Sequence, residues 1–352
     1  ADLMPLSGVI ANTAALMALT SYGDRIMSLS LQAGAHISQT SISSAGVLGL
    51  KSEYLVFDPE EMNIDVDKSR QKILKYRPKL VITAGSVYLF PHPVKEIKEI
   101  CDEVSARVMY DGAHVAGLIA GKAFPNPLGE GCDVVTFSSH KTFPGPQGGM
   151  ILCNDSLGKD NIKRLSEAAF PKLISNHHLH HVAGKAIAAA EMLEFGQGYA
   201  RQIVKNAKTL AAALYAHGFR VLGEKNGFTR SHQVLVDISK EGGGSKVADS
   251  LEKANIICSK QVLPYEDEKF TDPAGIRIGT QELTRVGMKE NEMDEIAGFM
   301  KRVIIDGENP ESVRDDVVAF KSNYNQVHYC FRSGEAYNYL DDIYNSIQHW
   351  MK

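Results

Sequence analysis

The amino-acid sequence predicts an α/β fold built on a mainly parallel sheet. Apolar runs typical of buried strands alternate with segments of helical spacing, which indicates a sheet covered by helices on both faces. The chain has 352 residues, 44% hydrophobic and 23% charged, which is ordinary for a globular enzyme and leaves room for two domains. We predict a large α/β domain at residues 1–198 and a smaller α+β domain at residues 199–352.

The expected elements follow from local patterns taken in chain order. Apolar runs predict strands at residues 25–29, 80–84, 107–111, 132–137 and 149–153, and, in the second domain, at 220–222, 233–238 and 275–278. Helical spacing predicts helices at residues 8–18, 93–105, 181–195, 199–217, 245–254, 290–303 and 311–322; the fourth leads into the second domain. The glycine-rich residues 241–245 predict a flexible turn before a helix.

Two chemically important residues follow neighbouring strand-like runs. Lys141 comes just after the run at 132–137, within a glycine-rich turn, and Asp111 ends the run at 107–111. Open α/β sheets bind ligands at the carboxyl ends of their strands, so both side chains are expected at one site. Pyridoxal phosphate requires an amine that forms a Schiff base and a carboxylate that keeps its ring nitrogen protonated. The pair therefore indicates a pyridoxal phosphate enzyme.

Composition excludes several other classes. A formal net charge of −4 gives no support for nucleic-acid binding through bulk charge. No apolar run is long enough to cross a bilayer, and no basic segment precedes an apolar stretch at the start, so we expect a cytoplasmic protein. The five cysteines are widely spaced and mostly lie in apolar runs, so they are predicted to be reduced core residues.

Five ordered motifs resemble the serine hydroxymethyltransferase family. Asp-Gly-Ala-His at residues 111–114 precedes Ser-Ser-His-Lys-Thr-Phe-Pro-Gly-Pro-Gln-Gly-Gly at 138–149. The other three are Pro-Leu-Ser-Gly-Val-Ile-Ala-Asn at 5–12, Gly-Ala-His-Ile-Ser at 34–38, and Gly-Ile-Arg-Ile-Gly-Thr at 275–280 followed by Leu-Thr-Arg at 283–285. The resemblance runs from the first residue to about residue 330. It implies the aspartate aminotransferase-like fold type I, with a mainly parallel seven-stranded sheet.

The resemblance also implies roles for individual residues. Lys141 would carry the cofactor and Asp111 would hold its ring nitrogen, while His36 would stack on the ring and assist proton movement. The remaining cofactor contacts would come from Ser7, Gly8 and Val9 at the phosphate, from Ser86 and His114 near the ring's phenolic oxygen, and from Ser138 and His140 beside the lysine. Arg277 would bind the substrate α-carboxylate, because a guanidinium group matches a carboxylate with two parallel hydrogen bonds.

The implied reaction interconverts serine and glycine and passes a one-carbon unit to tetrahydrofolate or tetrahydromethanopterin. Since family sites are built across subunits, the resemblance implies a homodimer or a higher assembly, with no nucleic-acid or membrane partner. Pro144 and Gln147 stand where arginines are common in the family, and Ser175 and Asn176 stand in place of a glycine segment. These departures indicate a divergent, archaeal-like branch.

Other interpretations stay open at this point. A pyridoxal phosphate aldolase or transaldolase acting on threonine or another β-hydroxy amino acid would share Lys141, Asp111, His36 and Arg277. Family members carry a segment before the Pro-x-Ser-Gly motif, whereas this sequence starts at that motif, so a fragment or non-catalytic paralogue is the third interpretation. The histidines at residues 177–181 have no neighbouring carboxylate or thiolate, so no metal site is predicted.

Overall fold

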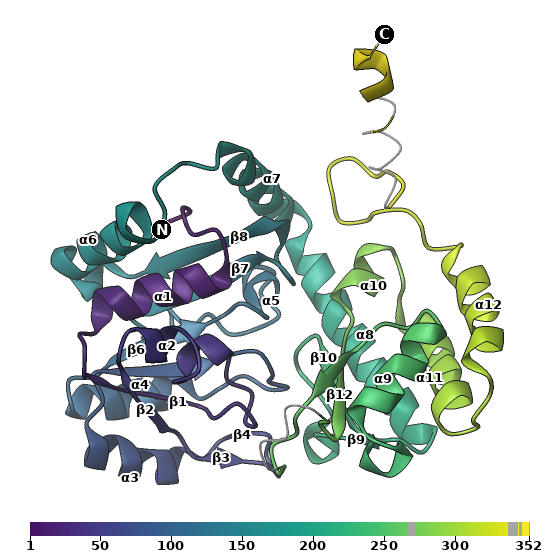
Figure 1. The fold of residues 1–352 in the computed structure, drawn as a ribbon, viewed down its shortest axis with the longest axis horizontal. Helices are drawn as coiled ribbons and strands as arrows, with labels where there is room; N and C mark the ends of the chain where they lie inside the picture. Colours follow the sequence, from purple (N-terminus) through teal and green to yellow (C-terminus); the bar gives the residue numbers. More distant parts are fainter. Residues whose placement is uncertain (267–271, 337–343, 345–346, 352) are drawn as a thin grey trace.

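The computed structural model describes residues 1–266, 272–336, 344 and 347–351. It contains a six-stranded sheet in the first half of the chain and a four-stranded sheet in the second half, and helix α8 (Gly196–Ala216) leads from one to the other (Figure 1). The predicted α/β class is confirmed. The predicted boundary between residues 198 and 199 falls in the first turn of α8, and the division into domains stays a prediction.

The six-stranded sheet has the order β2-β1-β5-β6-β7-β8. All neighbouring pairs are parallel except β7 and β8, which are antiparallel. The strands are β1 (Arg25–Ser28), β2 (Lys51–Tyr54), β5 (Leu80–Ala84), β6 (Arg107–Asp111), β7 (Val134–His140) and β8 (Pro144–Cys153). β2 was not predicted because its Lys-Ser-Glu-Tyr sequence is polar, which suits the edge of a sheet.

The expected count of seven strands is wrong for the residues that the structure describes. Beside β8, where a further strand could pair, Asp2 forms one isolated bridge with Ile151, and the chain then turns into helix α1 (Gly8–Leu19). Pro5 lacks a backbone N–H, so this segment cannot continue a regular ladder, although the Pro5 carbonyl still accepts from Gly149 at 2.8 Å. The N-terminal segment therefore covers the edge without forming a strand.

Alternate residues of the central strands face two different helix layers. Ile26, Leu80 and Met109 pack with α1 on one face, together with α6 (Lys159–Glu167). Met27 and Val108 pack on the opposite face, which is covered by α3 (Val66–Tyr76), α4 (Val94–Glu103), α5 (Ala116–Ala120) and the start of α8. Both faces are buried, which explains why the central strands are almost wholly apolar in sequence.

The second half forms an antiparallel sheet with helices packed against it, as the predicted α+β arrangement requires. Its order is β11-β12-β10-β9, and its core joins α8, α9, α11 and α12. The elements are β9 (Arg220–Val221), β10 (Gln233–Asp237), α9 (Gly244–Lys253), β11 (Ser259–Gln261), β12 (Gly275–Gly279), α10 (Gln281–Arg285), α11 (Glu290–Ile304) and α12 (Pro310–Lys321). The first half of the chain also contains the short elements α2 (Ser44–Val47), β3 (Phe57–Asp58) and β4 (Asn63–Ile64). Helix α7 (Leu179–Glu194) directly precedes α8.

The structure also bears on the cysteines and on the membrane. All five cysteines lie within the described ranges and have free thiols; Cys101 and Cys132 are core residues as predicted, whereas Cys153, Cys258 and Cys330 are only partly buried. Burial raises the pKa of Cys101 to about 12, so this thiol stays protonated and unreactive. Among the described residues, no helix combines the length and the apolar character that a bilayer crossing requires.

A buried lysine ties the N-terminal segment to the sheet. Lys185 of α7 is 2% exposed, and its Nζ donates to the carbonyls of Leu3 at 2.8 Å, Gly149 at 2.9 Å and Pro5 at 3.3 Å. These bonds join α7, β8 and the segment that leads directly into Ser7 and Gly8. The Lys185 ammonium group, bound by three carbonyl oxygens, therefore holds the segment that leads into α1 against the sheet.

We expect Lys185→Met to lower the free energy of unfolding by about 2–3 kcal/mol, because three buried carbonyls lose a charged donor. Urea denaturation followed by circular dichroism measures this change. Lys163→Met on the exposed surface of α6 is the matched control and is expected to change stability by less than about 0.5 kcal/mol. Equal effects of the two substitutions would contradict the structural role of Lys185.

A buried histidine supports the carboxyl end of β5. Ala84 has a left-handed backbone (φ 65°), and its N–H donates to Nδ1 of His92 at 3.0 Å. His92 is 4% exposed, and burial lowers its pKa to about 4. It is therefore neutral in the folded protein at neutral pH, and Nδ1 serves as an acceptor for the turn that follows β5.

This histidine predicts acid sensitivity. Between pH 6.5 and 4 the unfolded chain binds a proton at His92 that the folded chain does not, so stability falls as the pH is lowered through this window. We expect His92→Asn, whose Oδ1 can replace Nδ1 as acceptor, to reduce that fall by about 3 kcal/mol. Urea titrations at pH 7 and pH 4 test this, with His177→Asn on the surface as the control. An unchanged pH dependence in His92→Asn would refute the assignment.

Candidate active site

Lys141 lies in the turn between β7 and β8. β7 ends at His140, and the register with β8 is irregular between Ser138 and His140. The Lys141 Nζ donates to the Ser138 Oγ at 3.0 Å. Burial lowers the pKa of Lys141, the Asp111 carboxylate raises it, and the Arg277 guanidinium lowers it, with a net decrease. The amine therefore loses its proton more readily than a surface lysine, as a nucleophilic amine must.

Asp111 ends β6 and is held by neutral donors. Its side chain is 1% exposed. Oδ2 accepts from the Asn12 Nδ2 at 2.8 Å and from the Gln39 Nε2 at 3.0 Å, and Oδ1 accepts from the Ala113 N–H at 3.2 Å. The Thr136 hydroxyl donates to the Asn12 Oδ1, which orients the amide toward the carboxylate. A buried carboxylate with neutral partners is well suited to a protonated heterocyclic nitrogen.

His36 belongs to the same hydrogen-bond network. Its Nδ1 accepts from the backbone N–H of Ser38 at 3.2 Å and lies 2.8 Å from the Ser38 Oγ, which itself accepts from Asn12. When the ring is neutral, the proton is therefore on Nε2. Burial lowers the pKa of His36, and the nearby Asp111 partly opposes this effect. The ring is thus linked to Asp111 through Ser38 and Asn12.

The N-terminus of α1 lies against β7 beside the lysine. Ser7 is the N-cap, and its Oγ accepts from the Ile10 N–H at 3.2 Å. A Cβ added to Gly8 would lie 3.3 Å from the Ser138 Cβ, so only glycine leaves this contact relaxed. Gly8 and Val9 begin the helix, and N–H groups at such positions have no intrahelical acceptor. This end of α1 can hold a phosphate group next to Ser138.

Residues from the second half complete the site. The Arg277 Nη1 on β12 and the Gln233 Nε2 on β10 both donate to the Ser86 carbonyl at 2.9 Å. Gln233 Nε2 also lies 3.1 Å from the His114 Nδ1, and the His114 and His232 rings stack with centroids 5.6 Å apart. The turn after β5 is therefore bonded to both strands that carry these side chains.

Two cavities lie along this junction. One of about 360 Å³ is lined by His114, Lys141 and Arg277, among others, and a second of about 380 Å³ is lined by His36 and Ser86, among others. A larger cavity of about 720 Å³ is lined mainly by apolar side chains of α5, β7 and β8, and neither Lys141 nor Asp111 lines it. Lys141 and Arg277 line the first of the smaller cavities, and His36 lines the second. We therefore assign the site to these two cavities.

The structure brings most of the predicted site residues together. Lys141, Ser138, Asp111, His36, His114 and Arg277 share this junction, and Ser7 and Gly8 border it. His140 lies at the end of β7 with much of its surface exposed, and partial desolvation, followed by the charge of Lys141, lowers its pKa. The Ser86 carbonyl accepts from Arg277 and Gln233, and the contact of Ser86 with the ring's phenolic oxygen stays a prediction.

Several supporting residues were given no role in the sequence analysis. Asn12 and Ser38 end two of the recognised motifs, so their places in those motifs were a usable signal. Gln39, Thr136, His232 and Gln233 carry no such signal, because single polar residues in apolar surroundings have no distinctive spacing. Only folding brings them next to Asp111 and His114.

Comparisons with known proteins agree with this geometry. The serine hydroxymethyltransferase family profile matches residues 1–300. The serine hydroxymethyltransferase of Methanocella arvoryzae is 54% identical over 339 residues, covering 96% of this chain and 79% of that protein. The one from Methanocaldococcus jannaschii is 53% identical over 345 residues, covering 97% and 80%. The one from Thermococcus kodakarensis is 53% identical over 337 residues, covering 95% and 78%.

A solved structure supports the fold assignment. The crystal structure of L-threonine transaldolase from Pseudomonas fluorescens, in its internal aldimine state, superposes with a TM-score of 0.86 at 31% sequence identity. The match covers 94% of this chain and 74% of that protein. The motifs, the site and the relatives lead to one assignment: this chain belongs to the serine hydroxymethyltransferase family.

Proposed function

We propose that this protein is a pyridoxal phosphate-dependent serine hydroxymethyltransferase that interconverts serine and glycine. The observation that carries the proposal is the pairing of Lys141, an amine with a lowered pKa beside a serine hydroxyl, with the buried Asp111 carboxylate. Relatives about half identical to this chain carry the same name. The cofactor, when bound, supplies an electron sink for the carbanion left when a bond to the substrate Cα breaks.

The residues fit this cofactor at its aldehyde, its ring nitrogen and its phosphate. Lys141 would bind the aldehyde carbon, Asp111 would hold the proton of the ring nitrogen, and the N–H groups of Gly8 and Val9 would bind the phosphate with the Ser7 hydroxyl. His36 lies in the network of Asp111 and presents its protonated Nε2 away from Ser38. These roles rest on the geometry of the chain and on the family resemblance.

Arg277 would bind the substrate carboxylate. Its guanidinium faces the same cavity as Lys141, and one of its nitrogens is anchored on the Ser86 carbonyl. Burial lowers the pKa of Arg277 but leaves it cationic at neutral pH. The anchor limits rotation of the side chain and directs the remaining N–H groups toward the cavity, where a carboxylate can accept two parallel bonds.

Ser138 and His140 would assist the exchange between lysine and substrate amines. The Ser138 hydroxyl donates to the Ala113 carbonyl at 3.3 Å and accepts from Lys141 at 3.0 Å, so it stabilises the protonated amine. When Lys141 is neutral, this hydroxyl can donate to the lysine instead. Ser138 therefore stays bonded to Lys141 in either protonation state of the amine. The substrate amine can pass its proton to Lys141 while this Ser138–Lys141 hydrogen bond persists.

The co-substrate and the assembly are further parts of the proposal. The one-carbon acceptor would be tetrahydrofolate or tetrahydromethanopterin, and the protein would act in the cytoplasm as a homodimer or higher assembly. The family resemblance supports these assignments. It implies the assembly because family sites combine residues of two subunits.

A second candidate activity is transaldol transfer with threonine as donor. It is favoured by one observation, the similarity at 31% identity to L-threonine transaldolase. Both activities would use Lys141, Asp111 and Arg277, and they differ in the acceptor of the group that leaves the Cα. A pterin is required for the first and not for the second.

The experiment that separates these candidates measures glycine formation from serine with and without tetrahydrofolate or tetrahydromethanopterin, and acetaldehyde release from threonine with and without an added acceptor aldehyde. Pterin-dependent glycine formation from serine supports the hydroxymethyltransferase. Pterin-independent release of acetaldehyde from threonine that depends on the acceptor aldehyde, with slow turnover of serine, supports the alternative. Lys141→Ala is expected to lower either rate at least about 10³-fold by removing the nucleophile. A variant with wild-type activity would eliminate both candidates.

Arg277→Lys provides a separate test of substrate binding. A lysine offers a single charged donor group in place of the planar fork, so we expect the KM for serine to rise about 10- to 100-fold with a smaller change in kcat. Steady-state kinetics with saturating pterin measure both constants. Arg314→Lys on the exposed face of α12 is the control. A fall in kcat with unchanged KM would argue against carboxylate binding by Arg277.

A further inference from the structure

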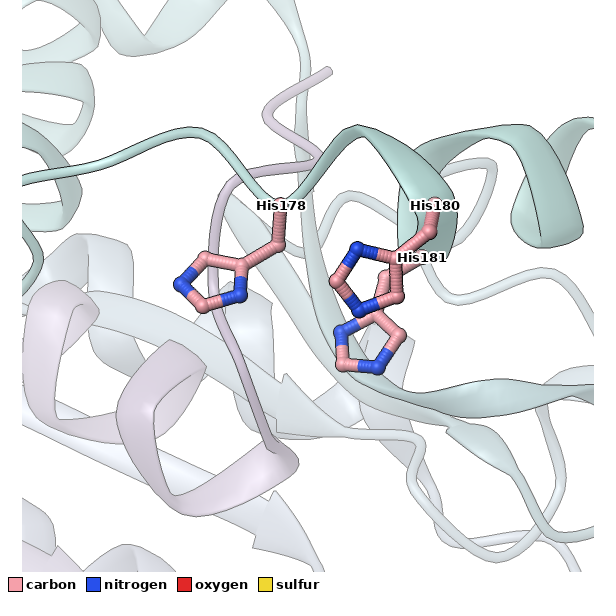
Figure 2. Close-up of side chains that lie close together, drawn as sticks. All are labelled: His178, His180 and His181. Atoms are coloured by element: carbon pink, nitrogen blue, oxygen red, sulfur yellow. The ribbon is translucent and has the colours of Figure 1, made fainter. Parts of the chain in front are cut away.

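Three histidines converge at the beginning of α7, outside the site described above. His178 is the N-cap of α7, and His180 and His181 lie in its first turn (Figure 2). Each of the three offers one ring nitrogen, and these nitrogens all lie within 4.8 Å of one another. The His180 and His181 ring centroids are 4.2 Å apart, and His178 lies 5.9 Å from each. His177 is excluded, because its ring stacks on Phe170.

The spacing is close to that of a metal centre. Around a tetrahedral ion with Zn–N distances of about 2.1 Å, ligand nitrogens lie about 3.4 Å apart. To reach this spacing, each pair of the three ring nitrogens must move closer together by at most about 1.4 Å. His180 is exposed and His178 only half-buried, so rotation of these two rings can bring their nitrogens closer.

One of the three rings has an unused ligand atom. The Nδ1 of His181 is buried and has no hydrogen-bond partner among the described residues. An unpaired buried nitrogen has a hydrogen-bonding capacity that the protein alone leaves unused.

We propose that His178, His180 and His181 form a binding site for a divalent transition-metal ion of the zinc type. Three imidazoles without a carboxylate or thiolate favour Zn²⁺, Co²⁺, Ni²⁺ or Cu²⁺ over Mg²⁺ or Ca²⁺. The fourth coordination position is available to water. The nearby Lys185 ammonium is bound to three carbonyls, which reduces its repulsion of an ion.

The site would have a structural role distinct from the proposed catalysis. The three histidines line neither of the cavities that contain Lys141 and His36. An ion held by them would join the N-cap of α7 to its first turn, and so order the segment that leads from residues 168–173 into the helix. This turn also precedes Lys185, which binds the segment before α1 to β8.

Equilibrium dialysis of the tag-free holoenzyme against Zn²⁺ tests the proposal, with bound metal measured by mass spectrometry. We expect one saturable ion per chain, and an affinity at least ten-fold lower in His180→Ala and in His181→Ala. His177→Ala is the matched control from the same segment and is expected to bind normally. His36→Ala controls for an ion bound in the cofactor site.

A second measurement identifies the ligands. Replacing Zn²⁺ by Co²⁺ is expected to produce visible absorption of a four-coordinate ion in the wild type and in His177→Ala, and to lose it in His180→Ala. The proposal is overturned if binding is not saturable, if the two triad variants bind as the wild type does, or if His36→Ala alone abolishes binding. His180 is exposed, so its replacement preserves the fold, which circular dichroism of the metal-free variant verifies.

Discussion

The buried Asp111 carboxylate is the interaction on which the site depends. It lies at the carboxyl end of β6 and receives hydrogen bonds from Asn12 on α1 and Gln39 in the loop after β1, two segments far apart in sequence. Because neutral amides satisfy the carboxylate, its negative charge remains available to a bound cation. The same Asn12 reaches Ser38 and thereby His36, so one network joins His36, the helix that begins at Gly8 and Asp111.

The second constraint is the contact between the two halves of the chain. The Ser86 carbonyl follows β5 and accepts from Gln233 on β10 and Arg277 on β12. The turn that presents this carbonyl depends on His92, which binds the N–H of Ala84 in a left-handed backbone conformation. The candidate carboxylate-binding arginine is therefore positioned by a backbone group of the other half, and it lines the same cavity as Lys141.

Local pattern predicted most elements to within a few residues. The strands ending at Ala84 and Asp111 have the predicted bounds, because their buried positions form mainly apolar runs. The extension of β7 to His140 was missed, since residues 138–140 are polar yet still pair with β8. β2, at the edge of the sheet, was missed because its sequence is also polar. The resemblance implied a seventh strand, whereas the described residues add only a single bridge at Asp2 to the edge of the sheet.

By itself the sequence determined the fold class and the family, and it predicted the principal groups Lys141, Asp111, His36 and Arg277. These are properties of ordered motifs and of apolar periodicity, which are local in the chain. Only the tertiary structure decided which neutral donors hold Asp111, that the Ser86 carbonyl binds Arg277, and that three of the four neighbouring histidines converge. Such contacts join residues up to 191 positions apart, or depend on how a helix begins, and neither composition nor local spacing specifies them.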